Sequence, residues 1–341
     1  MSGNARIAEV DVLRGLLAIT VVLGHAIQQY EMAIGEPWLA IKDLIYSFHM
    51  PAFVFASGFC VYRMPDQSNE NAGMGILWGR VRRLIIPYLS WGCVYFILRL
   101  LAGDYARIPY DYDHAVFFLL GYNPDGAMWF VWALFAATVF LLPLRKVSPK
   151  RLLLPIFLLI AVVHYSRLGS VSHWRALCAV PSYMFFILLG GLSRKWLEDS
   201  RASGFPRRIQ IGCACCFAVS YVLHISRFSR MFPWDALTSI SATLLLCSLA
   251  FEISRGWRLA RSPLVLLGVE AMSIYVLGEP VKVMCRIAFA KAGIPLVVAF
   301  PVMLACMFVL PITLARIIRR SVMLRQLLLG EFKAQGVPMV L

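Results

Sequence analysis

An arginine and a histidine that could do chemistry lie on one apolar segment near the N-terminus. Arg14 and His25 are eleven positions apart within the apolar run at about residues 10–29. In an α-helix this spacing puts them on one face, about 20° apart around the axis and roughly 16 Å apart along it. Ionisable side chains inside membrane helices usually face a partner or a cavity. Asp11 can neutralise Arg14 from three residues away, which leaves His25 without an ordinary explanation.

The composition is that of a protein embedded in a membrane. Of the 341 residues, 60% are hydrophobic and 15% are charged, and the mean hydropathy is +0.73. These values exclude an ordinary soluble globule and predict an all-α polytopic membrane protein. The nine cysteines show no CxxC pair and fall mostly in apolar runs, so we expect buried hydrophobic side chains and no metal site. The first run carries charges and no small-residue cleavage site, and so is unlike a secretory signal peptide.

Apolar runs of spanning length predict about ten transmembrane helices in a single domain covering residues 1–341. If the N-terminus is cytoplasmic, the cytoplasmic segments hold about twice as many Lys and Arg as the opposite loops, as the positive-inside rule requires. The net charge of +15 therefore reflects topology, and we expect no nucleic-acid partner. We expect cytoplasmic N- and C-termini, a cytoplasmic tail at about 317–341, and a multi-pass protein of the inner (cytoplasmic) membrane. The predicted helices lie at about 10–29, 43–62, 83–102, 127–144, 152–166, 176–193, 209–226, 235–253, 264–280 and 295–316.

The second predicted helix combines a histidine, a proline and a hydroxyl. Pro51 removes a backbone donor and is expected to kink the helix in its middle, and a kinked helix with a polar His49 usually lines a cavity. His49, Ser57 or a freed backbone N–H are candidates for stabilising an oxyanion. The alternative is that His49 packs against a neighbouring helix through a hydrogen bond.

Two further groups have an ordinary explanation beside the functional one. Arg80 and Arg83 share a helix face at a spacing of three, and guanidinium groups suit phosphate. Basic residues at a cytoplasmic helix end are also common topology anchors. Trp129 is a cavity candidate, but it also fits an aromatic belt.

The predicted outer loop Asp104–Asp125 mixes carboxylates with tyrosines. Carboxylates accept hydrogen bonds from sugar hydroxyls, and tyrosine rings offer a flat apolar surface, so Asp111 and Asp113 are candidates for binding an acceptor. An ordinary acidic loop with interfacial tyrosines explains the same pattern.

Together these motifs resemble the type 3 membrane acyltransferase family, and within it the fucose 4-O-acetylase-like branch of polysaccharide O-acetyltransferases. The resemblance covers nearly the whole chain and is strongest in residues 6–91. It rests on Arg14 and His25 with ten residues between them, Ser47–Pro51 followed by Ser57–Phe59, Arg80 and Arg83 leading into Leu84–Tyr88, and Trp129–Phe130.

The resemblance implies transfer of an acyl group, most often acetyl, from cytoplasmic acyl-CoA to a sugar or polysaccharide hydroxyl, with a lipid-linked acceptor among the candidates. No permanently bound cofactor is implied. His25 would act as general base or as a transient acyl carrier, and Arg14, Arg80 and Arg83 would bind coenzyme A. Many relatives have a histidine where this chain has Glu279, so that histidine's role does not transfer by residue type. Glu279 stays among the acceptor candidates.

Two other classes fit a membrane protein with buried ionisable residues. A secondary transporter or flippase of a polar cell-envelope intermediate would also bury histidine, arginine and aspartate. No inverted repeat or pair of discontinuous helices is visible in the sequence to favour it. A non-catalytic sensor module is the third possibility, but the chain holds no fused partner domain.

Overall fold

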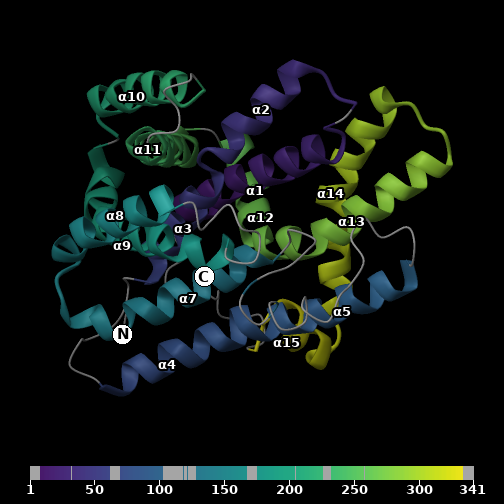
Figure 1. The fold of residues 1–341 in the computed structure, drawn as a ribbon, viewed down its shortest axis with the longest axis horizontal. Helices are drawn as coiled ribbons and strands as arrows, with labels where there is room; N and C mark the ends of the chain where they lie inside the picture. The colour runs from purple at the N-terminus through teal and green to yellow at the C-terminus, as the bar shows by residue number, and fades with distance from the viewer. Residues whose placement is uncertain are drawn as a thin grey trace. The chain divides into compact units, whose positions relative to one another are not determined.

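The computed structural model describes a helical protein (Figure 1), and all regular structure in the described ranges is helical. The ranges described are 8–31, 33–61, 70–102, 118, 121, 128–166, 175–203, 205–225, 232–256 and 258–332.

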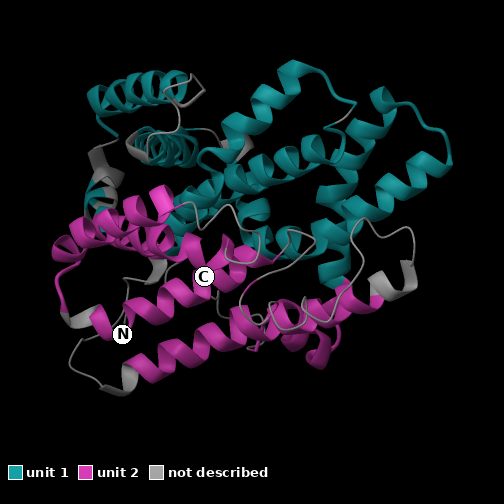
Figure 2. Ribbon diagram, in the orientation of Figure 1, with its two compact units in different colours: residues 1–57, 193–316, 340 teal, residues 58–192, 317–339, 341 magenta. Residues whose placement is uncertain are grey.

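The chain forms two compact units, each built from segments distant in sequence (Figure 2). Unit 1 comprises residues 1–57, 193–316 and 340, and unit 2 comprises residues 58–192, 317–339 and 341. Helices α3, α9 and α14 each contribute residues to both units. The helices wholly within unit 1 are α1 (Ala8–Gln29), α2 (Glu36–Tyr46), α10 (Arg207–Ile225), α11 (Phe232–Gly256), α12 (Arg258–Val269) and α13 (Ala271–Lys291).

Unit 2 contains the remaining helices and two short irregular ones. Its members are α4 (Glu70–Arg80), the π-helix η1 (Val81–Ile85), α5 (Ile86–Ala102), α7 (Trp129–Leu141), the 3₁₀-helix η3 (Pro143–Lys146), α8 (Pro149–Ser166) and α15 (Val322–Leu329). The helices shared by the two units are α3 (His49–Val61), α9 (Arg175–Ser203) and α14 (Leu296–Ile318).

Six helical segments are long and apolar enough to cross a membrane, or seven if a bent pair counts as one span, among the residues that the structure describes. This confirms a multi-pass helical protein. Helices are present at all ten positions where a span was predicted. However, α7 is short, and neither α4–α5 nor α10 meets the same length and hydropathy criteria for a span. The six segments are Ala8–Gln29, Glu36–Phe59, Pro149–Ser166, Arg175–Arg194, Trp234–Gly256 and Leu296–Ile318.

The first helix is the buried centre of unit 1. Its residues Val12 and Leu17 have no exposed surface, and it packs against α2, α11, α12 and α13. Glycines allow the closest of these approaches. A Cβ atom at Gly15 would overlap the backbone carbonyl of Leu264, and one at Gly268 would overlap the carbonyl oxygen of Asp11. Small residues let two backbones come this near, as is usual for helices packed in a membrane.

The second predicted helix is broken one turn earlier than its proline indicates. Ser47 and Phe48 form a turn between α2 and α3, so Pro51 lies in the first turn of α3 rather than in the middle of a kinked helix. The interruption expected from Pro51 is therefore present within the span Glu36–Phe59, one turn before the proline. A proline is tolerated in a first turn because the N–H that it lacks has no helical partner there.

The break is held by a contact that is remote in sequence. The hydroxyl of Ser239 in α11 donates to the carbonyl oxygen of Ser47 at 2.6 Å, across 192 residues. This bond satisfies a backbone acceptor that lacks an intrahelical donor, because the residue four positions on is Pro51, which has no N–H. The position of this turn determines that α3 begins at His49.

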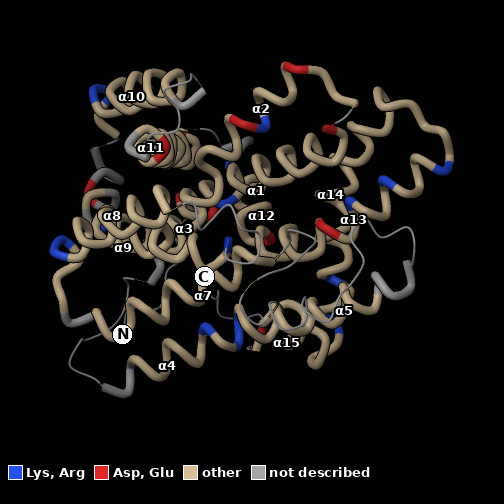
Figure 3. Tube along the Cα trace, viewed as in Figure 1, with Lys and Arg blue, Asp and Glu red and all other residues tan. Residues whose placement is uncertain are grey.

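Charged residues lie mainly towards the ends of the helices (Figure 3). Helix α13 departs from this pattern, since Glu279, Lys282 and Arg286 fall within its length. It follows α12 after a bend of 72°, an arrangement that suits a broken span or a re-entrant segment. The single predicted helix at 264–280 is thus divided between two helices. Charges at this depth in an apolar helix require partners or a polar cavity.

The basic segment Val81–Ile85 of unit 2 is wound as a π-helix, and α15 packs against it and against α5. The indole nitrogen of Trp91 donates to the carbonyl oxygen of Leu328 at 2.9 Å. Gly330 ends α15 with a φ of 66°, and a Cβ atom there would lie 2.8 Å from the carbonyl oxygen of Arg83. Single π-helical turns are frequent at functional sites.

Candidate active site

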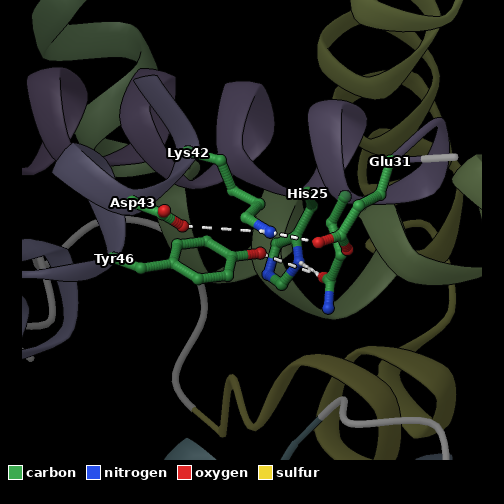
Figure 4. A network of polar contacts seen from close by, with 6 residues as sticks. His25, Glu31, Lys42, Asp43 and Tyr46 are labelled. Carbon is green, nitrogen blue, oxygen red and sulfur yellow. Dashed lines mark hydrogen bonds and ion pairs between the residues drawn. The ribbon is translucent and has the colours of Figure 1, made fainter. Parts of the chain in front are cut away.

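His25 lies near the C-terminal end of α1 and is half-buried. Its Nδ1 is 3.4 Å from the side-chain oxygen of Gln28, which also accepts a hydrogen bond of 3.0 Å from the hydroxyl of Tyr46. Figure 4 shows these contacts between the end of α1 and α2. A carbonyl oxygen can only accept, so Nδ1 carries the proton in this arrangement. The neutral ring then has its lone pair on Nε2, which is the form that a general base needs.

An ion pair closes the same end of the α1–α2 hairpin. Lys42 Nζ lies 2.5 Å from a carboxylate oxygen of Glu31 and 3.9 Å from one of Asp43 (Figure 4). Lys42 is well covered while both carboxylates are exposed. The pair ties the two helices together next to His25, because Glu31 follows α1 and Lys42 belongs to α2.

His49 is the second histidine of this region. It is buried, and its Nδ1 donates to the carbonyl oxygen of Ile45 at 2.8 Å. This bond also leaves the lone pair on Nε2. The rings of Tyr46 and His49 are 5.0 Å apart, and His49 interacts electrostatically with His25. A packing role predicts a hydrogen bond from His49 to a neighbouring helix. The bond that His49 makes goes instead to Ile45, four residues earlier in the chain.

A buried ion pair of α13 lies in the electrostatic environment of His25. Lys282 Nζ is 2.8 Å from a carboxylate oxygen of Glu279, and both side chains are largely buried. Lys282 also interacts electrostatically with His25. Glu279 therefore has a counter-ion on its own helix.

Arg14 is buried in the first half of α1, 4.0 Å from a carboxylate oxygen of Asp11. This is the pairing that the spacing predicts. Its partner Asp11 also lines a cavity of about 310 Å³, together with Ala8, Arg261, Ser262 and Val265. In the sequence Arg261 is one of the many basic residues whose distribution indicates topology, and no spacing rule links it to Arg14.

Arg80 and Arg83 belong to unit 2, whereas Arg14 and His25 belong to unit 1. Arg80 is buried at the end of α4, and Arg83 lies in the π-helix that follows. The arginine between them has a separate role, because the Arg82 guanidinium stacks on the rings of Trp78 and Phe332 at 5.0 and 5.4 Å. The three arginines of this segment therefore have different surroundings.

The remaining candidates are scattered. Ser57 is buried and donates to the carbonyl oxygen of Phe53 in its own helix at 3.1 Å, so its hydroxyl proton is already engaged. Trp129 begins α7 in unit 2, with the Arg175 guanidinium 5.9 Å from its ring. Asp111 and Asp113 lie outside the described residues.

Sequence reasoning missed Gln28, Tyr46 and Lys282. Gln28 is three residues beyond His25, on the same side of the helix, and that spacing was the available signal. Tyr46 and Lys282 come from other helices, so only the packing of those helices identifies them. Within the described ranges no group of three or more His, Cys, Asp or Glu side chains is placed to hold a metal ion.

Comparison with known proteins identifies similar sequences. A family model described as an acyltransferase domain matches residues 7–318. Nodulation protein NolL of Sinorhizobium fredii (strain NBRC 101917 / NGR234) is 30% identical over 138 residues, which are 39% of this chain and 35% of that protein. Nodulation protein NolL of Mesorhizobium japonicum (strain LMG 29417 / CECT 9101 / MAFF 303099) is 27% identical over 141 residues, 40% of this chain and 35% of that protein.

The matched region thus spans about a third of the length of each of these curated relatives. No solved structure matches the chain.

Proposed function

The chain belongs to the type 3 membrane acyltransferase family, and on that premise we propose that it acetylates a sugar hydroxyl. The donor is acyl-CoA on the cytoplasmic side of the inner membrane. The acceptor is a membrane-associated or exported sugar or polysaccharide. The observation that carries the proposal is the arrangement of His25, whose Nδ1 is hydrogen-bonded to Gln28 and whose Nε2 lone pair is left for chemistry.

The reaction needs one base in one tautomer. The acceptor hydroxyl gives its proton to His25 Nε2 as its oxygen attacks the thioester carbonyl carbon. The carbon–sulfur bond then breaks, and the proton passes from Nε2 to the sulfur of coenzyme A as the thiol leaves. Gln28 and Tyr46 keep the ring oriented throughout. A direct transfer of this kind uses His25 as the general base, and a covalent acyl-histidine is the competing route.

The donor is bound by arginines on the side of the membrane opposite His25. Arg14 lies roughly 16 Å along the helix axis from His25, a distance comparable to the extended pantetheine arm of coenzyme A. With the phosphates near Arg14 and the adjoining cavity, the thioester can reach the histidine. Arg80 and Arg83, in unit 2, are separate candidates for binding the donor, because guanidinium groups suit a pyrophosphate.

The acceptor is bound at the end of α1 that carries His25. A sugar tethered to the membrane fits this location better than a free cytoplasmic metabolite. Asp111 and Asp113 remain candidates for its recognition. Glu279 is already paired with Lys282. We therefore propose that Glu279 stabilises the surroundings of His25 and does not contact the sugar directly. His49 Nε2 is the better candidate for a direct polar contact, since Ser57 is engaged within its own helix.

The test uses membranes that contain the protein and acetyl-CoA labelled in its acetyl group. Label that moves into polysaccharide or lipid-linked sugar, and does so only when the protein is present, supports the proposal. Absence of any labelled acceptor, with normal export of the same polysaccharide, contradicts it.

A transporter or flippase is the second candidate, and one observation favours it. The bend of 72° between α12 and α13 resembles the broken helices of secondary transporters. In that case loss of the protein stops flux of an unmodified intermediate without changing acylation. Measuring acylation and flux in the same membranes separates the two candidates.

A further inference from the structure

The end of unit 1 that carries His25 contains polar atoms that the fold leaves unsatisfied. Gln29 Nε2, the Tyr30 hydroxyl and Arg286 Nε are all buried, and none has a hydrogen-bond partner among the residues that the structure describes. A buried donor without a partner costs free energy that a folded protein normally avoids. Three such atoms at one end of a unit are a suitable lining for a bound group that accepts hydrogen bonds.

Gln29 ends α1 and Tyr30 directly follows it, and Arg286 lies in α13, which packs against α1. Ala26 and Ile27 of α1 share a hydrophobic cluster with Val281 and Cys285 of α13. One turn along each helix, Tyr30 and Arg286 interact electrostatically, just as His25 and Lys282 do.

Gln29 adjoins this pair and lies one helical turn beyond His25 on the same face of α1. The unsatisfied group thus directly follows the candidate catalytic residue along the helix.

The charge of Arg286 sets it apart from its neighbours. Glu31 is paired with Lys42 and Glu279 with Lys282, and within the described ranges no carboxylate pairs with Arg286. Its guanidinium is held in the C-terminal part of an apolar helix. A cation in such a place usually has a partner, and a bound anion would serve as one.

The ring of Tyr30 is fixed in a way that orients its hydroxyl. It packs edge-on against Phe300 of α14, with ring centroids 6.4 Å apart. Phe300 is itself contacted by Trp38 at 5.0 Å. A preorganised hydroxyl loses little freedom on binding, so it can add to the affinity for a ligand.

We propose that Arg286, Tyr30 and Gln29 form a binding site for an oxyanion, a phosphate or a carboxylate, carried by the acyl acceptor. The geometry asks for a ligand that accepts several hydrogen bonds and bears negative charge. Both a lipid-linked phosphate and an acidic sugar meet that requirement. The assignment to the acceptor rests on the proposed function, because it places the oxyanion one turn from His25.

The test measures ligand-induced stabilisation of the full chain in phosphatidylcholine nanodiscs. Saturating coenzyme A is present, so that the donor site is filled, and ionic strength is held constant. The thermal midpoint is recorded against pyrophosphate, glucuronate and glucose. We expect pyrophosphate or glucuronate to raise the midpoint, as any ligand of the folded state does, and glucose to leave it unchanged. The anion that acts at the lower concentration identifies phosphate or carboxylate.

Variants assign the effect to the site. Arg286→Gln is expected to weaken anion binding by about tenfold or more, because hydrogen bonds to charged groups are the strong ones. Tyr30→Phe, which keeps the ring and its packing, should weaken it about threefold to tenfold and gives an answer even if Arg286→Gln fails to fold. Arg208→Gln, at an exposed position of α10, is the matched control and should bind like the parent.

Two outcomes overturn the proposal. One is equal stabilisation of the parent, Arg286→Gln and Tyr30→Phe by the anions. The other is loss of the anion effect when phosphatidylglycerol is added to the nanodiscs, since that assigns the site to a lipid headgroup. The shift of the thermal midpoint caused by coenzyme A alone is measured in a separate experiment. A protein that binds the oxyanion through Arg286 but neither binds coenzyme A nor transfers acetyl groups contradicts the proposed function and leaves the anion site standing.

Discussion

At the scale of single residues, His25 is the strongest test of the mechanism. Replacing His25 with alanine removes the proton acceptor, and loss of general acid–base catalysis costs ~10²–10⁴-fold in rate. We expect His25→Ala to be produced and folded like the parent and to lose at least ~100-fold of its acetyl transfer. His164→Ala, a histidine of α8 outside the site, should keep its activity. Transfer by His25→Ala at more than about a tenth of the parent rate would make it a packing residue.

The arginines of the basic segment should separate by role. If Arg80 and Arg83 bind coenzyme A, lysine at either position should raise the apparent KM for acyl-CoA and leave kcat nearly unchanged, because a lysine cannot reproduce a bidentate guanidinium contact. Arg82 stacks on Trp78 and Phe332, so Arg82→Lys should leave the KM near that of the parent. Steady-state kinetics of the three variants tests this. Parent-like behaviour of both Arg80→Lys and Arg83→Lys would make the pair a topology anchor.

The sequence could predict the residues that act alone but not those that act through packing. The prediction that Arg14 and His25 lie on one continuous helix is confirmed, because helical geometry alone determines it. The Arg14–Asp11 pairing is confirmed for the same reason. Tyr46 reaches Gln28 only because α2 folds back along α1, and no spacing within one segment contains that information.

At the scale of helices, two glycines give predictions of opposite sign. A Cβ atom at Gly268 would overlap the Asp11 carbonyl oxygen, so Gly268→Ala must push α1 and α12 apart and should destabilise the fold by about 1–3 kcal/mol. Gly212 in α10 has open space around it. There alanine should stabilise by about 0.5–1 kcal/mol, because it loses less conformational freedom in a helix. Thermal unfolding in detergent compares them, and a Gly268→Ala variant as stable as Gly212→Ala contradicts this packing.

The break between α2 and α3 shows why helix boundaries were harder to predict than helix positions. Both halves are apolar, so the pattern at about 43–62 favours one helix, and Pro51 is the only visible interruption. The chain turns at Ser47 and Phe48, one turn before Pro51, and the Ser47 carbonyl oxygen that the proline leaves without a donor accepts the bond from Ser239. A partner 192 residues away leaves no local signal.

At the scale of the whole molecule, the two units draw on segments from both halves of the chain. The predicted ten-helix order gives no hint of this division, because hydropathy reports where helices lie and not which helices pack together. The α12–α13 pair shows the same limit. The run at about 264–280 predicts one span, whereas the structure has a bend of 72° within it. The charged side chains of α13 are the sequence feature that distinguishes this region from an ordinary apolar span.

The orientation of the chain in the membrane is the remaining prediction, and it decides which side of the membrane His25 and Arg286 serve. The distribution of Lys and Arg predicts a cytoplasmic C-terminal tail and an outer α13–α14 turn. Ala292 in that turn and Met323 in α15 are both exposed. In a cysteine-depleted background, Ala292→Cys should react with a membrane-impermeant maleimide in right-side-out vesicles. Met323→Cys should react only after permeabilisation. The opposite pattern would put His25 on the cytoplasmic side and require a cytoplasmic acceptor.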